Sequence, residues 1–106
     1  MKIGIILYSN EPEAAWNALR LGVEALNKNH SAKIFLLGKG VEIEGLKSEK
    51  FDVQKMVDSF KKGSGQILAC GTCLKIREKN ESKICPISTM GELLELVTES
   101  DKILTF

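Results

Sequence analysis

The sequence predicts an α/β protein with three layers, in which helices cover both faces of a mainly parallel five-stranded sheet. Continuous apolar runs such as KIGIILYS are typical of strands that are buried on both faces. Segments with helical periodicity separate these runs, and alternation of strands and helices favours parallel pairing. The 106 residues, 43% of them hydrophobic, can bury one core. We therefore expect a single domain over residues 1–106.

The first half of the chain supplies two strands and two helices. The first strand, over 2–9, precedes a helix that begins near Pro12, a residue suited to a first helical turn because it lacks an N–H. Ser9 or Asn10 would cap this helix. A second strand, AKIFLLG, runs into a long glycine-bearing loop, GKGVEIEGLKSEK. Apolar residues at helical spacing then predict a helix after Asp52, its expected cap.

The second half of the chain repeats the alternation. Apolar runs predict three more strands, and TMGE has the spacing of a capping box at the start of a helix. In order, we expect a strand over 66–70, a short helix through about Lys79, a strand over 84–87 with Lys83, a helix after Thr89 and a strand over 102–106.

Composition and charge exclude several classes of protein. The formal net charge is +1 and aromatic residues are only 6%, so a nucleic-acid-binding surface has little support. The apolar run in MKIGIILYSN is too short for a signal peptide or a membrane span. Three cysteines without a secretion signal indicate a reducing compartment. We expect a cytoplasmic protein with neither nucleic-acid nor membrane partners.

The candidate site is CGTC, directly after the third predicted strand. Ligands and chemistry gather at the carboxyl ends of parallel strands. A helix N-terminus and nearby cations would stabilise a Cys70 thiolate and lower its pKa. Lys75 and Arg77 are those cations, or they receive an anionic partner, and Thr72 can cap the helix. Buried, chemically inert thiols remain an alternative for both Cys70 and Cys73.

Residues of the first predicted loop reach the same edge of the sheet. Asn10 and Glu11 follow the first strand, so they would line the site. They are equally suited to a structural role as a helix cap and an acidic side chain near the positive end of the helix.

Spacing separates the chemical interpretations of CGTC. A thioredoxin-like dithiol requires C-x-x-C, which is present, although the motif follows the third strand here. A phosphatase loop requires arginine six positions after the cysteine, where Ile76 stands. A zinc site needs four ligands, and Cys85 and His30 lack the spacing of a second pair. We therefore expect no metal and no cofactor. The remaining interpretation is a cysteine that carries sulfur as a persulfide and transfers it by thiol exchange.

Three further features favour ordinary structural roles. Cys85 in KICPIS is expected to be a packed thiol, and His30 in KNHSAK a surface loop residue. GKG at 38–40 lacks the full phosphate-loop pattern, so we interpret it as a turn after the second strand.

Several stretches together resemble the DsrE/DsrF-like family. They are LYSNEPEAAWNALRLGVEAL, AKIFLLGKGVEI, ILACGTCLKIRE and ISTMGELLELVTESDKILTF. CGTCL and the last stretch are also similar to the DsrE-like domain of sulfurtransferase-like selenium-metabolism proteins. The resemblance covers essentially the whole chain.

The resemblance implies a cytoplasmic homotrimer or homohexamer that handles sulfur. The relay cysteine of the family, which takes sulfur from a small carrier protein, corresponds to Cys70. Cys73 has no counterpart in the best-understood relay subunits but is present in the CGTC branch, and Glu78 replaces a glycine that usually follows the motif. The resulting hypothesis is a sulfur-transfer protein with Cys70 as nucleophile and Cys73 as a second thiol that resolves or shares the adduct. The alternatives are a dithiol redox protein and a non-catalytic assembly subunit with inert thiols.

Overall fold

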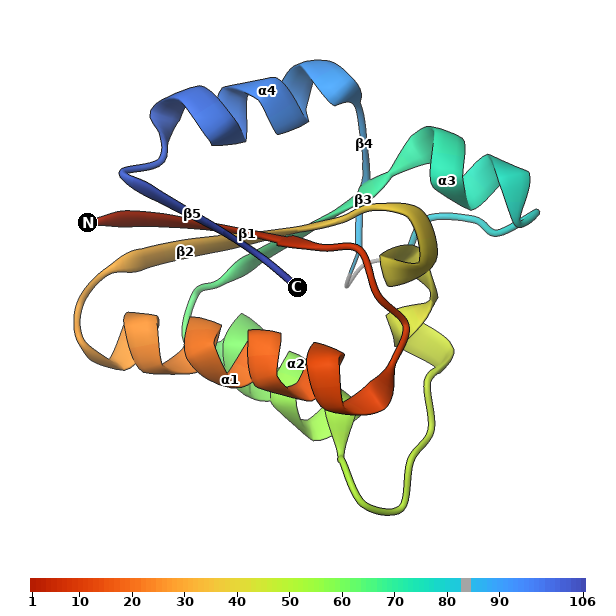
Figure 1. The fold of residues 1–106 in the computed structure, drawn as a ribbon, viewed down its shortest axis with the longest axis horizontal. Helices are drawn as coiled ribbons and strands as arrows, with labels where there is room; N and C mark the ends of the chain where they lie inside the picture. Colours follow the sequence, from red (N-terminus) through yellow and green to blue (C-terminus); the bar gives the residue numbers. More distant parts are fainter. Residues whose placement is uncertain (83–84) are drawn as a thin grey trace.

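A computed structural model describes residues 1–82 and 85–106 and confirms the predicted α/β class (Figure 1). Five strands form one sheet in the order β4-β3-β2-β1-β5. Every neighbouring pair is parallel, so the sheet is parallel throughout. The strands are β1 (Lys2–Leu7), β2 (Ser31–Leu36), β3 (Gln66–Cys70), β4 (Ile87–Ser88) and β5 (Lys102–Thr105).

Helices cover both faces of the sheet (Figure 1). The path from β1 through β2 to β3 crosses the sheet in one direction, and the path from β4 to β5 returns in the other. Right-handed crossovers therefore place the intervening helices on opposite faces. On one face lie α1 (Pro12–Asn27) and α2 (Val53–Lys62), and on the other lies α4 (Met90–Glu99). The short helix α3 (Gly71–Ile76) extends beyond the carboxyl end of β3.

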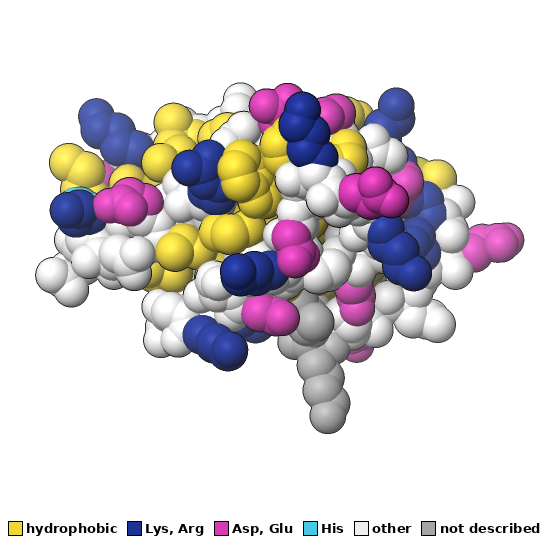
Figure 2. Space-filling model, turned by 90° about the horizontal axis from the view of Figure 1, so that it is seen from below, with side chains coloured by type: hydrophobic (Ala, Val, Ile, Leu, Met, Phe, Trp, Pro, Cys, Tyr) yellow, Lys and Arg dark blue, Asp and Glu magenta, His cyan; other side chains and the backbone are white. Residues whose placement is uncertain are grey.

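The core lies between the sheet and the helix pair α1 and α2. Alternate residues of a strand face the same side, and Ile5 and Leu7 of β1 and Ile34 of β2 are fully buried. Phe60 of α2 is also fully buried. Figure 2 views this side of the molecule and shows Lys and Arg interspersed with Asp and Glu around hydrophobic side chains. Among the described residues, no helix combines the length and apolar character needed to cross a bilayer.

Several predicted boundaries differ from the structure; the first strand, for example, ends at Leu7 and not at Ser9. The loop after β2 contains a 3-10 helix, η1 (Gly38–Gly45), in which Gly40 lies directly against the carbonyl group of Leu7 at the end of β1. The fourth strand begins at Ile87, later than predicted, and Lys83 and Ile84 lie outside the described residues. The helix after CGTC ends at Ile76 and not near Lys79, because Glu78 adopts a positive φ of 53° that stops helical hydrogen bonding.

The caps predicted for α2 and α4 are confirmed, and the cap predicted for α1 is wrong. The side chains of Asp52 and Thr89 each accept a hydrogen bond from a backbone N–H of the following turn. The cap of α1 is Glu11, whose carboxylate accepts the amide hydrogen of Ala14 at 2.7 Å. Neither Ser9 nor Asn10 takes that place: the helix begins at Pro12 as expected, and the hydroxyl of Ser9 instead accepts the amide hydrogen of Glu11.

Candidate functional site

The CGTC turn brings two thiols into contact at the carboxyl end of β3. Cys70 is the last residue of the strand and the N-cap of α3, and its Sγ accepts the backbone N–H of Cys73 at 3.3 Å. The prediction that Thr72 caps this helix is wrong, because the side chain of Cys70 serves as the N-cap. The thiol of Cys73 donates to Cys70 Sγ at a distance of 2.8 Å. The two sulfurs therefore form one unit within a single turn.

A backbone amide from the β2 loop completes the surroundings of the second sulfur. The N–H of Gly38 donates to Cys73 Sγ at 3.1 Å. Gly38 adopts a φ of +56°, and a Cβ at this position would lie 2.7 Å from the Tyr8 ring. Glycine is therefore required at this position for the amide to point at the thiol. The GKG segment was predicted to be a turn; it instead forms the first residues of the 3-10 helix η1, and it supplies a hydrogen bond that spacing did not indicate.

The two thiols differ in exposure. Cys70 is only 3% exposed, whereas Cys73 is half-buried. Burial, followed by the hydrogen bond with the neighbouring thiol, raises the pKa of Cys70 above its ordinary value. The lowered pKa expected from sequence is wrong for Cys70, because desolvation outweighs the stabilising backbone N–H groups.

Arg77 lies at the site but is paired with a carboxylate. Its Nε donates to Glu42 Oε2 at 2.6 Å, and its Nη1 donates to the carbonyl oxygen of Cys73 at 3.1 Å. Asn10 Nδ2 donates to the other oxygen of Glu42 at 3.3 Å. The bond to Arg77 is the main reason that the pKa of Glu42 lies below its ordinary value. The guanidinium therefore ties α3 to η1, and the structure places it against Glu42 and not against a thiol.

Sequence reasoning missed Glu42. It lies 35 residues before Arg77, inside a segment predicted to be a loop, and its spacing to CGTC resembles no known motif. Two of the predicted site residues, Asn10 and Arg77, meet at this carboxylate. Glu11 instead caps α1, and Lys75 is exposed on α3.

Cys85 does not join the dithiol. It precedes β4, so it does not lie at the carboxyl edge of the sheet, and it is buried as expected for a packed thiol. Burial, then the charge of Glu44, raises its pKa to about 11. Within residues 1–82 and 85–106, no cluster of three or more His, Cys, Asp or Glu side chains is arranged to hold a metal ion.

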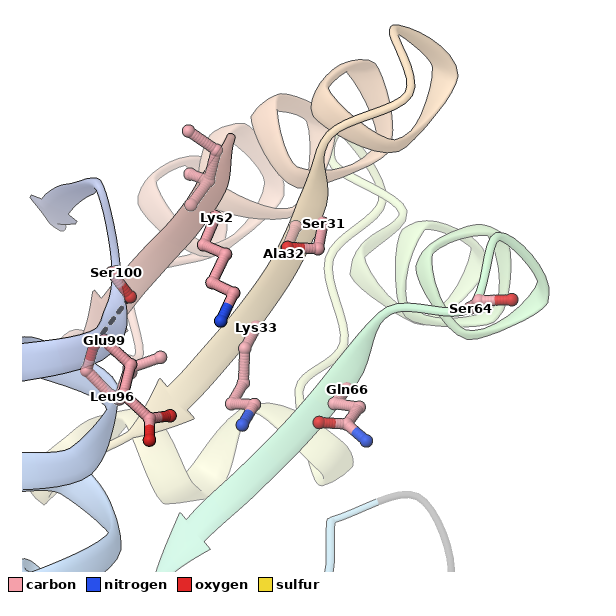
Figure 3. Close-up of a pocket in the computed structure, with 10 residues that line it drawn as sticks. Lys2, Ser31, Ala32, Lys33, Ser64, Gln66, Leu96, Glu99 and Ser100 are labelled. Atoms are coloured by element: carbon pink, nitrogen blue, oxygen red, sulfur yellow. Dashed lines mark hydrogen bonds between the residues drawn. The ribbon is translucent and has the colours of Figure 1, made fainter.

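A cavity of about 210 Å³ lies at the opposite, amino-terminal edge of the sheet (Figure 3). Lys2, Lys33 and Gln66 line it from the amino-terminal halves of the central strands, and Glu99 lines it from the end of α4. The described lining contains neither cysteine nor histidine. Its lysines face the carboxyl end of α4, where positive charge is favourable to a helix. This cavity is therefore separate from the thiol chemistry.

Two known proteins are similar in sequence to most of this chain. The chain is 30% identical over 100 residues to an uncharacterized protein of Methanocaldococcus jannaschii, covering 89% of this chain and 88% of that one. It is 31% identical to an uncharacterized protein of Methanopyrus kandleri, covering 89% and 83%.

Two solved structures share the fold. The ychN protein from E. coli superposes with a TM-score of 0.83 at 24% identity, with both chains fully covered. A conserved protein of unknown function from Bacteroides thetaiotaomicron superposes with a TM-score of 0.78 at 19% identity, covering 99% of this chain and 94% of that one. At these identities the likeness concerns the fold alone.

The family assignment rests on a match over the whole length of the chain. The model of the DsrE/DsrF-like family matches residues 1–106, which include every strand of the parallel sheet and the dithiol turn at its edge. The protein is thus a member of the DsrE/DsrF-like family.

Proposed function

We propose that this protein carries sulfur as a cysteine persulfide on the Cys70–Cys73 dithiol and takes part in intracellular sulfur transfer. The observation that carries the proposal is the 2.8 Å contact between the two thiols at the carboxyl edge of the sheet. Backbone N–H groups of Cys73 and Gly38 point at the two sulfurs and would stabilise negative charge there. Membership of a family associated with sulfur relay supports the same chemistry. Free thiols fit a reducing, cytoplasmic setting.

The difference in exposure suggests the order of the transfer steps. The thiolate of Cys73, the more accessible thiol, attacks the outer sulfur of a donor persulfide. A sulfur–sulfur bond forms on Cys73 while the bond in the donor breaks, and the donor leaves as a thiolate with the electron pair. Cys70 then attacks the same outer sulfur, and its proton passes to the departing Cys73 thiolate. Burial of Cys70 would protect the stored sulfur from solvent thiols.

A persulfide-loading experiment tests this function. Incubation with inorganic polysulfide should add the mass of one sulfur atom to the wild-type protein. We expect Cys73→Ser to load more slowly, because the accessible thiol is lost, and Cys70→Ser to lose its adduct faster, because the protected thiol is lost. Cys85→Ser is the matched control and should behave like the wild type. Intact-mass spectrometry over time measures these four proteins and the Cys70→Ser/Cys73→Ser double variant. An absent adduct, or one that persists in the Cys70→Ser/Cys73→Ser variant, would contradict the proposal.

A dithiol redox function is the second candidate, favoured by the same 2.8 Å contact. Oxidised glutathione would then convert the two thiols into a reversible disulfide through a mixed disulfide, with release of reduced glutathione. This candidate predicts rapid exchange and no sulfur adduct in the loading experiment. Slow alkylation of every thiol at neutral pH would instead identify a non-catalytic assembly subunit.

The sulfur donor or acceptor is expected to be a small carrier protein that approaches α3. Lys75 is exposed on this helix and can receive an anionic partner. Arg77 is engaged by Glu42, so it would shape the approach by holding the backbone of Cys73.

Self-association into a trimer or hexamer is part of the proposal. Met90, Leu94 and Val97 follow helical spacing on α4, and the first two are 60% and 63% exposed. A contiguous exposed apolar stripe is typical of an interface. We expect Leu94→Glu to shift the protein towards monomer because a charge would be buried. Light scattering after size-exclusion chromatography measures this, with Glu95→Gln on the same helix as control. An unchanged mass for Leu94→Glu would rule out this face.

A further inference from the structure

The hydroxyl group of Ser88 is buried without a hydrogen-bond partner. Ser88 is 4% exposed, and its Oγ finds no donor or acceptor within residues 1–82 and 85–106. Buried hydroxyl groups in native proteins are nearly always hydrogen-bonded, because desolvation without a partner destabilises the fold. An unpartnered hydroxyl is therefore a feature that needs an explanation, and a ligand absent from the resting protein supplies one.

The position of Ser88 places this hydroxyl beside the dithiol. Ser88 ends β4 and pairs with Cys70, the last residue of β3, in the parallel register. Paired residues of parallel strands direct their side chains to the same face, and their backbones lie about 4.8 Å apart. The next residue, Gly71, passes so close that a Cβ there would lie 3.1 Å from the carbonyl oxygen of Ser88. The chain around Cys70 is therefore held tightly against β4.

The resting thiol of Cys70 already has its own contacts. Its sulfur accepts the N–H and the thiol hydrogen of Cys73. A persulfide adds an outer sulfur about 2 Å beyond Sγ, and this outer atom carries the negative charge after ionisation. In a buried site such an anion requires a hydrogen-bond donor. The hydroxyl of Ser88 is a donor on the same face of the adjacent strand.

We propose that Ser88 binds the outer sulfur of a Cys70 persulfide by donating a hydrogen bond from its Oγ. This inference rests on the proposed sulfur-carrying function and names the group that receives the transferred atom. Ser88 makes and breaks no covalent bond. Transfer forms the bond between Cys70 Sγ and the outer sulfur and breaks the bond of that sulfur to the donor, which leaves as a thiolate. The hydroxyl is unpartnered before this step and satisfied after it, so it favours the loaded protein.

Ser88→Ala tests the proposal because it removes the donor and little volume. We expect the melting temperature of the unloaded variant to equal or exceed that of the wild type, since an unsatisfied group has been removed. Persulfide occupancy at a fixed polysulfide concentration should fall about tenfold, as expected for a lost hydrogen bond to a charged group. Ser88→Thr retains the hydroxyl and should restore occupancy. Ser100→Ala is the matched control, because its hydroxyl donates to Leu96 at the other end of the fold.

The outcomes separate this inference from the proposed function. Wild-type occupancy in Ser88→Ala, or a lower melting temperature with normal occupancy, would show a purely structural serine and overturn the inference while leaving sulfur transfer intact. A wild-type protein that acquires no sulfur would overturn both. Loss of occupancy in Ser88→Ala, its recovery in Ser88→Thr and normal loading of Ser100→Ala would support the inference.

Discussion

Gly40→Ala is expected to destabilise the protein by about 3 kcal/mol or more, because its side chain has no space. A Cβ at Gly40 would overlap the carbonyl oxygen of Leu7, the last residue of β1. The oxygen belongs to the backbone, and the position of a Cβ is fixed by its own backbone, so the clash cannot be relieved by a change of rotamer. To relieve the clash, η1 would have to move away from β1. This movement would withdraw the amide of Gly38 from Cys73 and the carboxylate of Glu42 from Arg77. Urea denaturation measures the stability, and the alkylation rate of Cys73 reports on the site.

A second glycine in the same 3-10 helix provides the control. No atom lies within 4 Å of the Cβ position at Gly45. We therefore expect Gly45→Ala to alter the free energy of unfolding by less than about 0.5 kcal/mol, as is usual for surface substitutions. Equal effects of Gly40→Ala and Gly45→Ala would contradict the proposed close approach of η1 to β1.

Phe60→Ala is expected to lower the free energy of unfolding by about 3–5 kcal/mol, the usual range for removing a buried aromatic side chain. The ring is fully buried and packs where α2 meets α1. A Cβ at Gly22 of α1 would lie 2.7 Å from this ring, so glycine permits the close packing of the two helices. Phe60→Leu, which retains most of the volume, should be less destabilising. Denaturant melts of both variants measure the difference, and equal losses would contradict the packing argument.

The same contact predicts a non-additive pair of substitutions. Gly22→Ala should destabilise the wild type, because the new methyl group meets the Phe60 ring. In the Phe60→Ala background the methyl group enters the space left by the ring, so the cost of Gly22→Ala should fall or vanish. A double-mutant cycle measures this coupling. Strict additivity would mean that the two side chains do not share the space.

The features predicted well are those that depend on residues close together in sequence. β3 spans Gln66–Cys70 as expected, because its apolar run ends abruptly at a glycine. Asp52 and Thr89 cap their helices as predicted, because a capping side chain reaches only the amides of the next turn. The cap at Glu11 was missed because several consecutive residues could serve, and only the path of the chain out of β1 selects one.

The electrostatic expectation for the dithiol was wrong for a different reason. The position of Lys75 and Arg77 after CGTC suggested cations near the thiolate. A side chain on a short helix can point along several directions, and Arg77 points to Glu42. Burial of Cys70 then dominates its pKa. The order of charged residues in the sequence does not reveal which of them lies next to the thiol in space, or how far the thiol is exposed to water.

The amino-acid sequence by itself determined the α/β class, the order of the elements and the placement of Cys70 and Cys73 at the carboxyl end of a strand. These follow from hydrophobic periodicity and turn chemistry, which act within single elements. Only the tertiary structure decided that the amide of Gly38 reaches Cys73, that Glu42 pairs with Arg77, and that Ser88 lies opposite Cys70 on the adjacent strand. Gly38 and Glu42 come from η1 and Ser88 comes from β4, and the pairing of strands and the close turn at Gly40 bring these segments to the end of β3. The order of strands in the sheet determines which distant residues become neighbours, and this order depends on the packing of the whole chain.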